Sequence, residues 1–142
     1  MVRQRPVSRQ EGHKVAEHKP DLFAGEKYLS IETYRKSGTP VSTPVWFAAD
    51  NGHPATLYVY SLANAGKVKR IRNNPSVRVA PCTMRGALRG EWAPAQARIV
   101  DSGEATRGHA LLNKKYWMKP IGDFFSRLRG RTQVIIAIRL ST

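Results

Sequence analysis

The chain has 142 residues, of which 41% are hydrophobic, a length that allows one domain but not two independent hydrophobic cores. Its 24 Lys and Arg outnumber 10 Asp and Glu, so the formal net charge is +14. This composition excludes a disordered chain, and it leaves nucleic acid, an acidic membrane surface or a polyanionic small molecule as partners.

Cysteine usage and hydropathy narrow the cellular context. Cys82 is the sole cysteine, so no disulfide can form within one chain, and we expect a small buried hydrophobic residue there. No run approaches eighteen consecutive apolar residues, and the beginning of the chain lacks the apolar segment of a secretory signal. We therefore expect a cytoplasmic protein with no membrane partner.

Residues 1–20 are polar, charged and aperiodic, so we expect a flexible basic tail followed by one domain over residues 21–142. Within that domain the dominant pattern is a period-two alternation, as at Leu29, Ile31 and Thr33. We predict six strands, over residues 27–36, 41–49, 56–60, 76–84, 96–104 and 132–140.

Turn residues and one proline set the connections between the first three strands. The letters SGTP follow the first strand, and Asn51 and Gly52 follow the second, so both links are predicted to be hairpin turns. Pro44 lies within the second strand and has no N–H to give to a ladder. We therefore expect Pro44 at an edge or a bulge.

The pattern becomes helical after the third strand, where Ala65, Val68 and Ile71 share one stripe and the letters NNP end the helix. A second helix is predicted over residues 106–116, and a turn or third helix around residues 122–128. Short antiparallel strands with an early and a late helix predict a mainly β fold with minor α, a small six-stranded barrel with two to three helices.

The first of these helices is strongly basic and lies in SLANAGKVKRIRNNPSV, residues 61–77. We expect it to begin near Ala63 with Ser61 and Asn64 as caps, and Gly66 to let an anionic ligand approach the backbone. Its cations form two ridges, Lys67 with Arg70 and Lys69 with Arg72. The helix either holds an anion or presents a solvated basic face.

The second strand contains STPVWF, which mixes apolar, aromatic and hydroxyl side chains. Alternation places Thr43, Val45 and Phe47 on one face and Ser42, Pro44 and Trp46 on the other. Such a mixture can bind a flat heteroaromatic ring, because apolar groups flank the ring while polar groups meet its carbonyl and imide edge. The alternative is an ordinary barrel strand with Trp46 in the core.

Other chemistry has no signature in the sequence. The four histidines, His13, His18, His53 and His109, show no metal-ligand spacing, and Cys82 has no partner in a ligand pattern. No strand-turn-helix nucleophile elbow is visible. We predict no metal site and assign no catalytic acid, base or nucleophile.

The stretch LYVYSLANAGKVKRIRNNPSVRVAP, preceded by GTPVSTPVWFA, resembles the pyridoxamine 5′-phosphate oxidase-like split-barrel superfamily. It resembles most the branch of deazaflavin (coenzyme F420)-dependent oxidoreductases, over about residues 29–140. The resemblance implies a split β-barrel homodimer with cofactor sites at its interface. It also implies hydride transfer between the reduced deazaflavin and an unsaturated or otherwise electrophilic small-molecule substrate.

The resemblance further implies a set of cofactor-binding residues. In the superfamily the phosphate is held where the third strand turns into the helix, and the lysine of that turn corresponds to Lys67. Tyr60 and Ser61 match the strand-end pair that contacts the cofactor, and Gln96, at the start of the predicted fifth strand, matches a glutamine of the phosphate oxidases. The segment that lines the ring corresponds to Ser42, Thr43, Pro44, Val45 and Trp46.

The sequence departs from the phosphate oxidases at Gly66, where they carry an arginine, and this disfavours FMN and pyridoxamine phosphate. Deazaflavin coenzymes end in an oligoglutamate tail, which suits the additional cations Lys69, Arg70 and Arg72 better than a single phosphate does. We therefore expect coenzyme F420, with FMN or FAD as alternatives. Tyr116 and Trp117 are expected to cover the ring from the partner subunit or to pack in the core.

Two readings from other functional classes stay open. A flavin- or haem-binding protein without turnover is one, because the scaffold binds cofactors whether or not chemistry follows. A basic nucleic-acid-binding module is the other, favoured by charge alone. The cations lack interleaved aromatic residues on a strand platform, and no familiar nucleic-acid motif is present, so nucleic acid is disfavoured.

Overall fold

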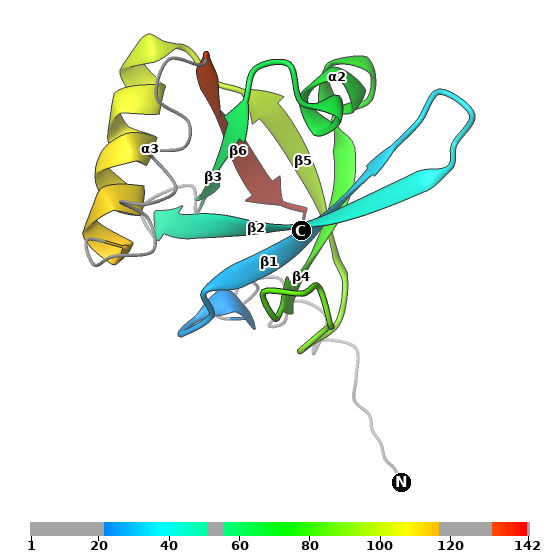
Figure 1. The fold of residues 1–142 in the computed structure, drawn as a ribbon, viewed down its shortest axis with the longest axis horizontal. Coiled ribbons are helices and arrows are strands. Elements are labelled where there is room, and N and C mark those ends of the chain that lie inside the picture. Colours follow the sequence, from blue (N-terminus) through cyan, green and yellow to red (C-terminus); the bar gives the residue numbers. More distant parts are fainter. Residues whose placement is uncertain (1–21, 51–55, 117–131, 142) are drawn as a thin grey trace, which may run out of the picture.

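A computed structural model of the protein describes residues 22–50, 56–116 and 132–141. Six antiparallel strands close into one barrel in the order β1-β2-β3-β6-β5-β4, and the helices α2 and α3 lie on different sides of it (Figure 1). The predicted mainly β fold, a six-stranded antiparallel barrel, is confirmed. The elements are β1 Tyr28–Tyr34, β2 Pro40–Asp50, β3 Thr56–Leu62, α2 Gly66–Asn73, β4 Ser76–Cys82, β5 Ala93–Ile99, α3 Ser102–Lys115 and β6 Gln133–Leu140.

The barrel interior is filled by the apolar side chains that alternate along the strands. In β1 these are Leu29 and Ile31, both fully buried, as the period-two pattern predicts. Helix α2 adds Val68 and Ile71 to the same cluster, so the predicted apolar stripe of this helix is confirmed. Cys82 is buried with a free thiol, also as expected.

A second apolar cluster lies outside the barrel, beneath α3. It joins the outward side chains of β2, β3 and β6 to the inner face of the helix: Ala48, Tyr58, Tyr60, Leu112, Tyr116, Ile135 and Ala137. Helix α3 comes closest to the sheet at Gly108, where an added Cβ would lie 2.9 Å from Cγ2 of Ile135. The glycine therefore sets how closely α3 packs on the strands.

Strand β2 changes partners along its length, and this leaves a local gap between β2 and β3 in the wall of the closed barrel. Residues from Pro40 to Trp46 pair with β1, whereas residues from Phe47 to Asp50 pair with β3. The last pair between β3 and β2 is Val59 with Phe47. Beyond it β3 continues to Leu62, paired only with β6, its neighbour on the other side. We call the opening between residues 44–46 of β2 and 60–62 of β3 the fork.

Pro44 sits on the open edge at this fork. The Arg35 N–H donates to the carbonyl of Thr39 at 2.9 Å, and hydrogen-bonded pairs alternate along an antiparallel ladder. Pro44, opposite Ser30, is therefore in a non-hydrogen-bonded pair, with its nitrogen turned away from β1 and toward the fork. The predicted edge position of Pro44 is confirmed.

The predicted start of the basic helix is wrong. Strand β3 runs on to Leu62, the N–H of Ala65 donates to the Leu62 carbonyl at 3.1 Å, and the helix begins only at Gly66. Its N-cap is Ala65 and no side chain caps it. Ser61, expected as a cap, instead donates its hydroxyl to the Leu62 carbonyl at 3.1 Å, and Asn64 is exposed.

The predicted fifth strand and second helix are also displaced. Strand β5 ends at Ile99, and Asp101 caps α3 by accepting a bond from the Glu104 N–H at 3.0 Å. An acidic cap three residues before a glutamate starts a helix at Ser102, so residues 102–104 belong to α3 and not to a strand. Gln96 accordingly lies in the middle of β5 and not at its start.

Several expectations fall outside the described residues. These are the tail over residues 1–20, the turn at Asn51 and Gly52, the turn or helix around residues 122–128, and Trp117. None of the helices that the structure describes is long and apolar enough to cross a membrane.

Candidate functional site

A pocket of about 360 Å³ opens at the fork, within the size range of small-molecule sites. Strand β2 lines it with Pro44, Val45 and Trp46, and β3 lines it with the last three residues before its end, Tyr60, Ser61 and Leu62. The pocket exists because β2 and β3 part after the Phe47–Val59 pair. The change of partner along β2 thus creates the concavity.

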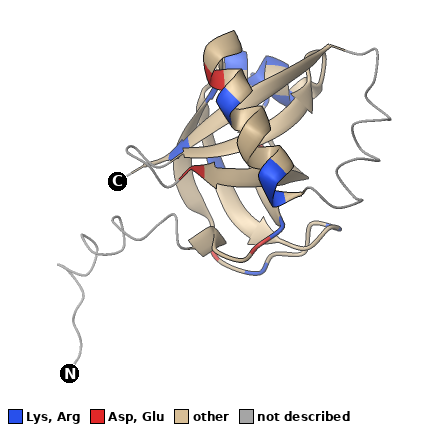
Figure 2. Ribbon diagram, turned by 90° about the vertical axis from the view of Figure 1, so that its left-hand side faces the viewer, with Lys and Arg blue, Asp and Glu red and all other residues tan. Residues whose placement is uncertain are grey.

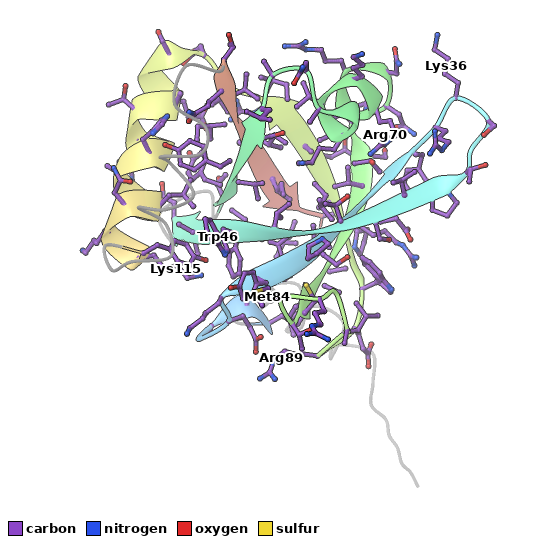
Figure 3. All side chains as sticks on the ribbon, in the orientation of Figure 1. Lys36, Trp46, Arg70, Met84, Arg89 and Lys115 are labelled. Atoms are coloured by element: carbon purple, nitrogen blue, oxygen red, sulfur yellow. The ribbon has the colours of Figure 1, made fainter. Side chains whose placement is uncertain are left out.

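One wall of the pocket is aromatic. The ring of Trp46 lies 6.5 Å from that of Tyr28, its partner in the β1–β2 ladder, and stacks on Tyr116 with centroids 5.8 Å apart and an interplanar angle of 28°. Met84, from the loop after β4, is 66% exposed at the pocket lip, on the side where Trp46 lies in Figure 3. These groups can flank a flat ring but leave the pocket partly open.

The α2 side of the pocket is cationic. Lys67 lines it and is half-buried, so burial lowers the pKa of Lys67 and the nearby Arg70 lowers it further. Among the described residues, no carboxylate lies within ion-pair distance of Lys67, whereas Arg78 and Arg98 each meet a glutamate at 2.7 and 2.8 Å. A partly buried cation without an acid beside it is suited to an anionic ligand.

Arg70 is held in place next to Lys67. Its Nε donates to Oγ1 of the fully buried Thr33 at 2.7 Å, and one guanidinium nitrogen would lie 2.7 Å from a Cβ added at Gly66. Gly66 thus leaves room for this guanidinium at the start of α2. Burial, and then the charge of Arg35, lower the pKa of Arg70.

We call Lys67, Arg70 and Arg35 the cationic cluster. Arg35 follows the end of β1, and Figure 3 shows the β1–β2 hairpin, with Lys36 at its tip, projecting on the side where Arg70 lies. Helix α3 also carries basic residues, and Figure 2 shows them in its upper half and at its lower end, with one acidic residue near its upper end.

The structure brings half of the predicted cofactor-binding residues to the pocket. Pro44, Val45, Trp46, Tyr60, Ser61 and Lys67 all line it. Gly66 and Arg70 lie directly beside Lys67, whereas Lys69 is exposed on the other ridge of α2. Ser42 and Thr43 lie farther along β2, outside the lining, where they pair with β1.

Gln96 lies apart from this pocket. Its Nε2 donates to Oγ of Ser76 at 3.2 Å, and it lines a separate hollow together with Arg98 and Arg139. Its predicted role in cofactor binding stays a prediction. Tyr116 is buried within its own chain, with its hydroxyl on the backbone of Lys27 and Phe47, so this side chain is not available to cover a ring in a second subunit.

Four contributors to the site escaped sequence analysis: Tyr28, Met84, Arg35 and His109. Tyr28 could have been found, because a two-strand ladder closed by the SGTP turn places it opposite Trp46. The other three reach the site through contacts between segments distant in sequence. His109, for example, meets the Tyr60 hydroxyl although 49 positions separate them.

Among the described residues, no three His, Cys, Asp or Glu side chains gather in a way that could hold a metal ion. What the fork offers instead is an aromatic wall, a few polar groups and a cationic end. This arrangement suits an organic molecule with a flat ring and a negatively charged extension.

No family model matches the sequence, and no curated protein matches it significantly. Solved structures do share the fold. A pyridoxamine 5′-phosphate oxidase-like protein of Listeria innocua aligns with a TM-score of 0.62 at 16% identity, over 90% of this chain and 94% of that one. The haem storage protein HutZ of Vibrio cholerae gives 0.65 at 16% identity, over 89% of each chain.

An F420 reductase aligns with a TM-score of 0.56 at 21% identity, over 86% of this chain and 92% of that one. The F420-dependent protein is one of several kinds that share the barrel with this chain. At these identities the likeness establishes the split-barrel fold.

Proposed function

We propose that this split-barrel chain binds coenzyme F420 at the fork and transfers hydride between the coenzyme and a small unsaturated or electrophilic molecule. One observation carries the proposal: the pocket joins an aromatic wall at Trp46 to a partly buried Lys67 that has no carboxylate beside it among the described residues. A ring with an anionic extension fits both ends.

Different residues at the fork would bind different parts of the coenzyme. Trp46, Tyr28 and Tyr60 would flank the ring, and Lys67 would hold the phosphate by a charge-assisted hydrogen bond. Arg70, fixed by its bond to Thr33, and Arg35 would meet further negative charge beyond the phosphate. The cations at Lys69 and Arg72 face solvent and would contribute only long-range attraction.

The cationic cluster favours F420 over FMN. A single phosphate needs fewer cations than the cluster of three provides, whereas an oligoglutamate tail carries several carboxylates. The two guanidinium groups lie close enough for the charge of Arg35 to lower the pKa of Arg70. An anion between them would relieve this repulsion.

The bound coenzyme would supply the hydride chemistry itself. The chain would orient the ring against the wall of Trp46, neutralise the phosphate at Lys67 and limit the access of water. The apolar pairing of Val45 with Leu29 beneath the pocket keeps this part of the wall fixed to the barrel core.

Direct comparison of ligands tests the proposal. Equilibrium binding of F420, FMN and FAD to the purified protein, followed by fluorescence quenching, should give the smallest Kd for F420. Turnover of reduced F420 with electrophilic substrates would then separate an enzyme from a storage or carrier protein. Tighter binding of FMN or FAD would replace the F420 proposal by a flavin-binding one.

We also infer a homodimer with the cofactor at the interface. The pocket is partly open and Met84 at its lip is 66% exposed, so a second subunit would shelter the ring from water. Sedimentation analysis should show a dimer whose dissociation weakens cofactor binding. A monomer that keeps full affinity would contradict this inference.

A further inference from the structure

The side chain of Arg70 links helix α2 to strand β1 next to the pocket. Its Nε donates to Oγ1 of Thr33 at 2.7 Å, and Figure 3 shows Arg70 between α2 and the base of the β1–β2 hairpin. Thr33 is fully buried and is paired with Val41 in the ladder, so the strand holds the accepting oxygen in place. Donor and acceptor are unambiguous here, because a guanidinium carries N–H donors and no acceptor.

Arg70 also folds back along its own helix. A Cβ added at Gly66 would lie 2.7 Å from Nη1 of Arg70 and 3.5 Å from its Cζ, so the guanidinium fills the space that a side chain at position 66 would need. Gly66 is the first residue of α2, and the next residue, Lys67, lines the pocket. Gly66 and Thr33 together therefore hold the guanidinium at the first turn of α2, beside Lys67.

The bond to Thr33 determines which edge of the guanidinium remains available to a ligand. A carboxylate binds a guanidinium through two parallel N–H···O bonds, either from the Nε side or at the edge formed by the two terminal nitrogens. At Arg70 the hydrogen of Nε is used by Thr33. Among the described residues, none accepts a hydrogen bond from Nη1 or Nη2, and no carboxylate lies within ion-pair distance of this guanidinium. The Nη1–Nη2 edge is therefore the one that can receive an anion.

We propose that Thr33 is a positioning residue that, by accepting from Nε, holds the Nη1–Nη2 edge of Arg70 ready for a carboxylate of the ligand, next to the phosphate bound by Lys67. The inference deepens the proposed function and rests on it. It makes Thr33 and Arg70 the residues that distinguish a coenzyme with a carboxylate extension from one that ends in a phosphate.

Two physical arguments support a carboxylate at this edge. The two oxygens of a carboxylate lie in one plane and match the two terminal nitrogens of Arg70, whereas the ammonium of Lys67 is a point charge that attracts a phosphate without fixing its orientation. An arginine normally loses rotamer freedom when it binds a ligand. Because Thr33 restricts Arg70 before any ligand arrives, less of that entropy is lost on binding.

Ligand affinity tests the role of Thr33, with oxidised F420 as the probe that carries carboxylates and FMN as the probe that ends in a phosphate. Thr33→Val keeps the shape of the side chain but removes the acceptor, so it should raise the Kd of F420 about two- to tenfold, the scale of immobilising one long side chain. The Kd of FMN should stay within about twofold. Thr33→Ser keeps an acceptor and should restore much of the affinity for F420.

Variants of Arg70 complete the test. Arg70→Ala should raise the Kd of F420 at least as much as Thr33→Val does, and the double variant should be no worse than Arg70→Ala alone, because Thr33 acts through Arg70. Arg72→Ala, on the exposed side of α2, should change the Kd of F420 only slightly, and Thr106→Val, exposed on α3, should change neither Kd. An unchanged Kd of F420 in Thr33→Val would overturn the proposal. Equal losses for F420 and FMN would also overturn it and would assign Arg70 to the phosphate.

Nuclear magnetic resonance of the ligand-free protein tests the contact independently of any ligand. The Nε–H of Arg70 should exchange slowly with water in the wild type and rapidly in Thr33→Val. Rapid exchange in the wild type would overturn the positioning role of Thr33. Failure of both probes to bind the wild type would instead refute the proposed function, and with it the carboxylate of the ligand, while a slowly exchanging Nε–H would still establish the contact between Thr33 and Arg70.

Discussion

The Tyr116 hydroxyl bonds the backbone of Phe47, donating to its carbonyl at 2.7 Å and accepting from its N–H at 3.3 Å. The same hydroxyl also lies 2.6 Å from the carbonyl of Lys27. The last pair of the β1–β2 ladder is Tyr28 with Trp46, so Lys27 and Phe47 are where the two backbones part. Tyr116 thus satisfies backbone groups that the ladder leaves without partners.

Tyr116→Phe should therefore destabilise the fold. The substitution leaves buried backbone groups of Phe47 unsatisfied, which costs about 1–3 kcal/mol of unfolding free energy. Urea denaturation should show a lower midpoint with an unchanged slope. Tyr28→Phe, at a residue that is only partly buried, is the control and should change stability by less than about 0.5 kcal/mol.

Lys67→Ala should weaken cofactor binding through loss of a charge-assisted bond. A bond of about 1.5–3 kcal/mol corresponds to a rise in the Kd of F420 on the order of tenfold to a hundredfold. Lys69→Ala removes the same charge from the exposed ridge of α2 and should change Kd only slightly. Equal losses in the two variants, with the fold intact by circular dichroism, would show that α2 acts only by long-range attraction.

Gly108→Ala and Gly103→Ala should have opposite effects although both lie in α3. At Gly108 a Cβ would lie 2.9 Å from Ile135 and 3.1 Å from Tyr58, so the helix must shift, at a cost of about 1–3 kcal/mol. At Gly103 the nearest atom would be 3.6 Å away, and alanine should stabilise the helix by up to about 1 kcal/mol. Thermal unfolding of both variants measures the difference, and a stabilised Gly108→Ala would show that α3 can move outward without loss.

Glu32 should make the stability of the barrel depend on acid pH. Its Oε1 accepts from Arg78 at 2.7 Å and from Tyr34 at 2.8 Å; the bond from Arg78 is the main reason that the pKa of Glu32 is lowered below 4.5, and burial opposes it. A carboxyl whose pKa is lower in the folded state stabilises the protein above its unfolded pKa. That contribution is lost as pH falls through the folded value.

Glu32→Gln should accordingly reduce the unfolding free energy by about 1–2 kcal/mol at pH 7, because Arg78 is partly exposed and the bond is screened. The difference from the wild type should shrink as pH falls from about 4.5 downward. Glu26→Gln, whose partner Arg89 is more exposed, is the control and should change stability little at any pH. Denaturation curves at pH 7, 5 and 3 measure the difference in unfolding free energy between Glu32→Gln and the wild type. A difference that stays the same at all three pH values would exclude the titration of Glu32 as its cause.

The strands and the basic helix could be predicted because their signals are local. Alternation at Leu29 and Ile31 gives the buried face of β1, and Val68 and Ile71 give the buried side of α2. The start of α3 differs from the prediction because the predicted fifth strand extends through Asp101 to residue 104. Asp101 and Glu104 nevertheless form a local capping pattern that indicates the start of a helix.

The candidate site could be predicted only in part, because it depends on where strands separate. STPVWF indicates ring-binding groups, but whether Trp46 or Ser42 reaches the pocket is decided by the switch of β2 from β1 to β3. The bond from Arg70 to Thr33 joins residues 37 positions apart, and no spacing in the sequence encodes it. The same holds for the meeting of His109 with Tyr60.

Pro44 has a consequence for self-association. The part of β2 before Phe47 has no partner on its β3 side, and such a strand edge can accept a strand from another molecule and seed aggregation. Because the nitrogen of Pro44 faces that edge and carries no hydrogen, an incoming strand would find a ladder donor missing at the end of the opening farthest from the Phe47–Val59 pair. The residue that shapes the pocket thus also discourages another chain from closing the opening by strand addition, which leaves it open to small molecules.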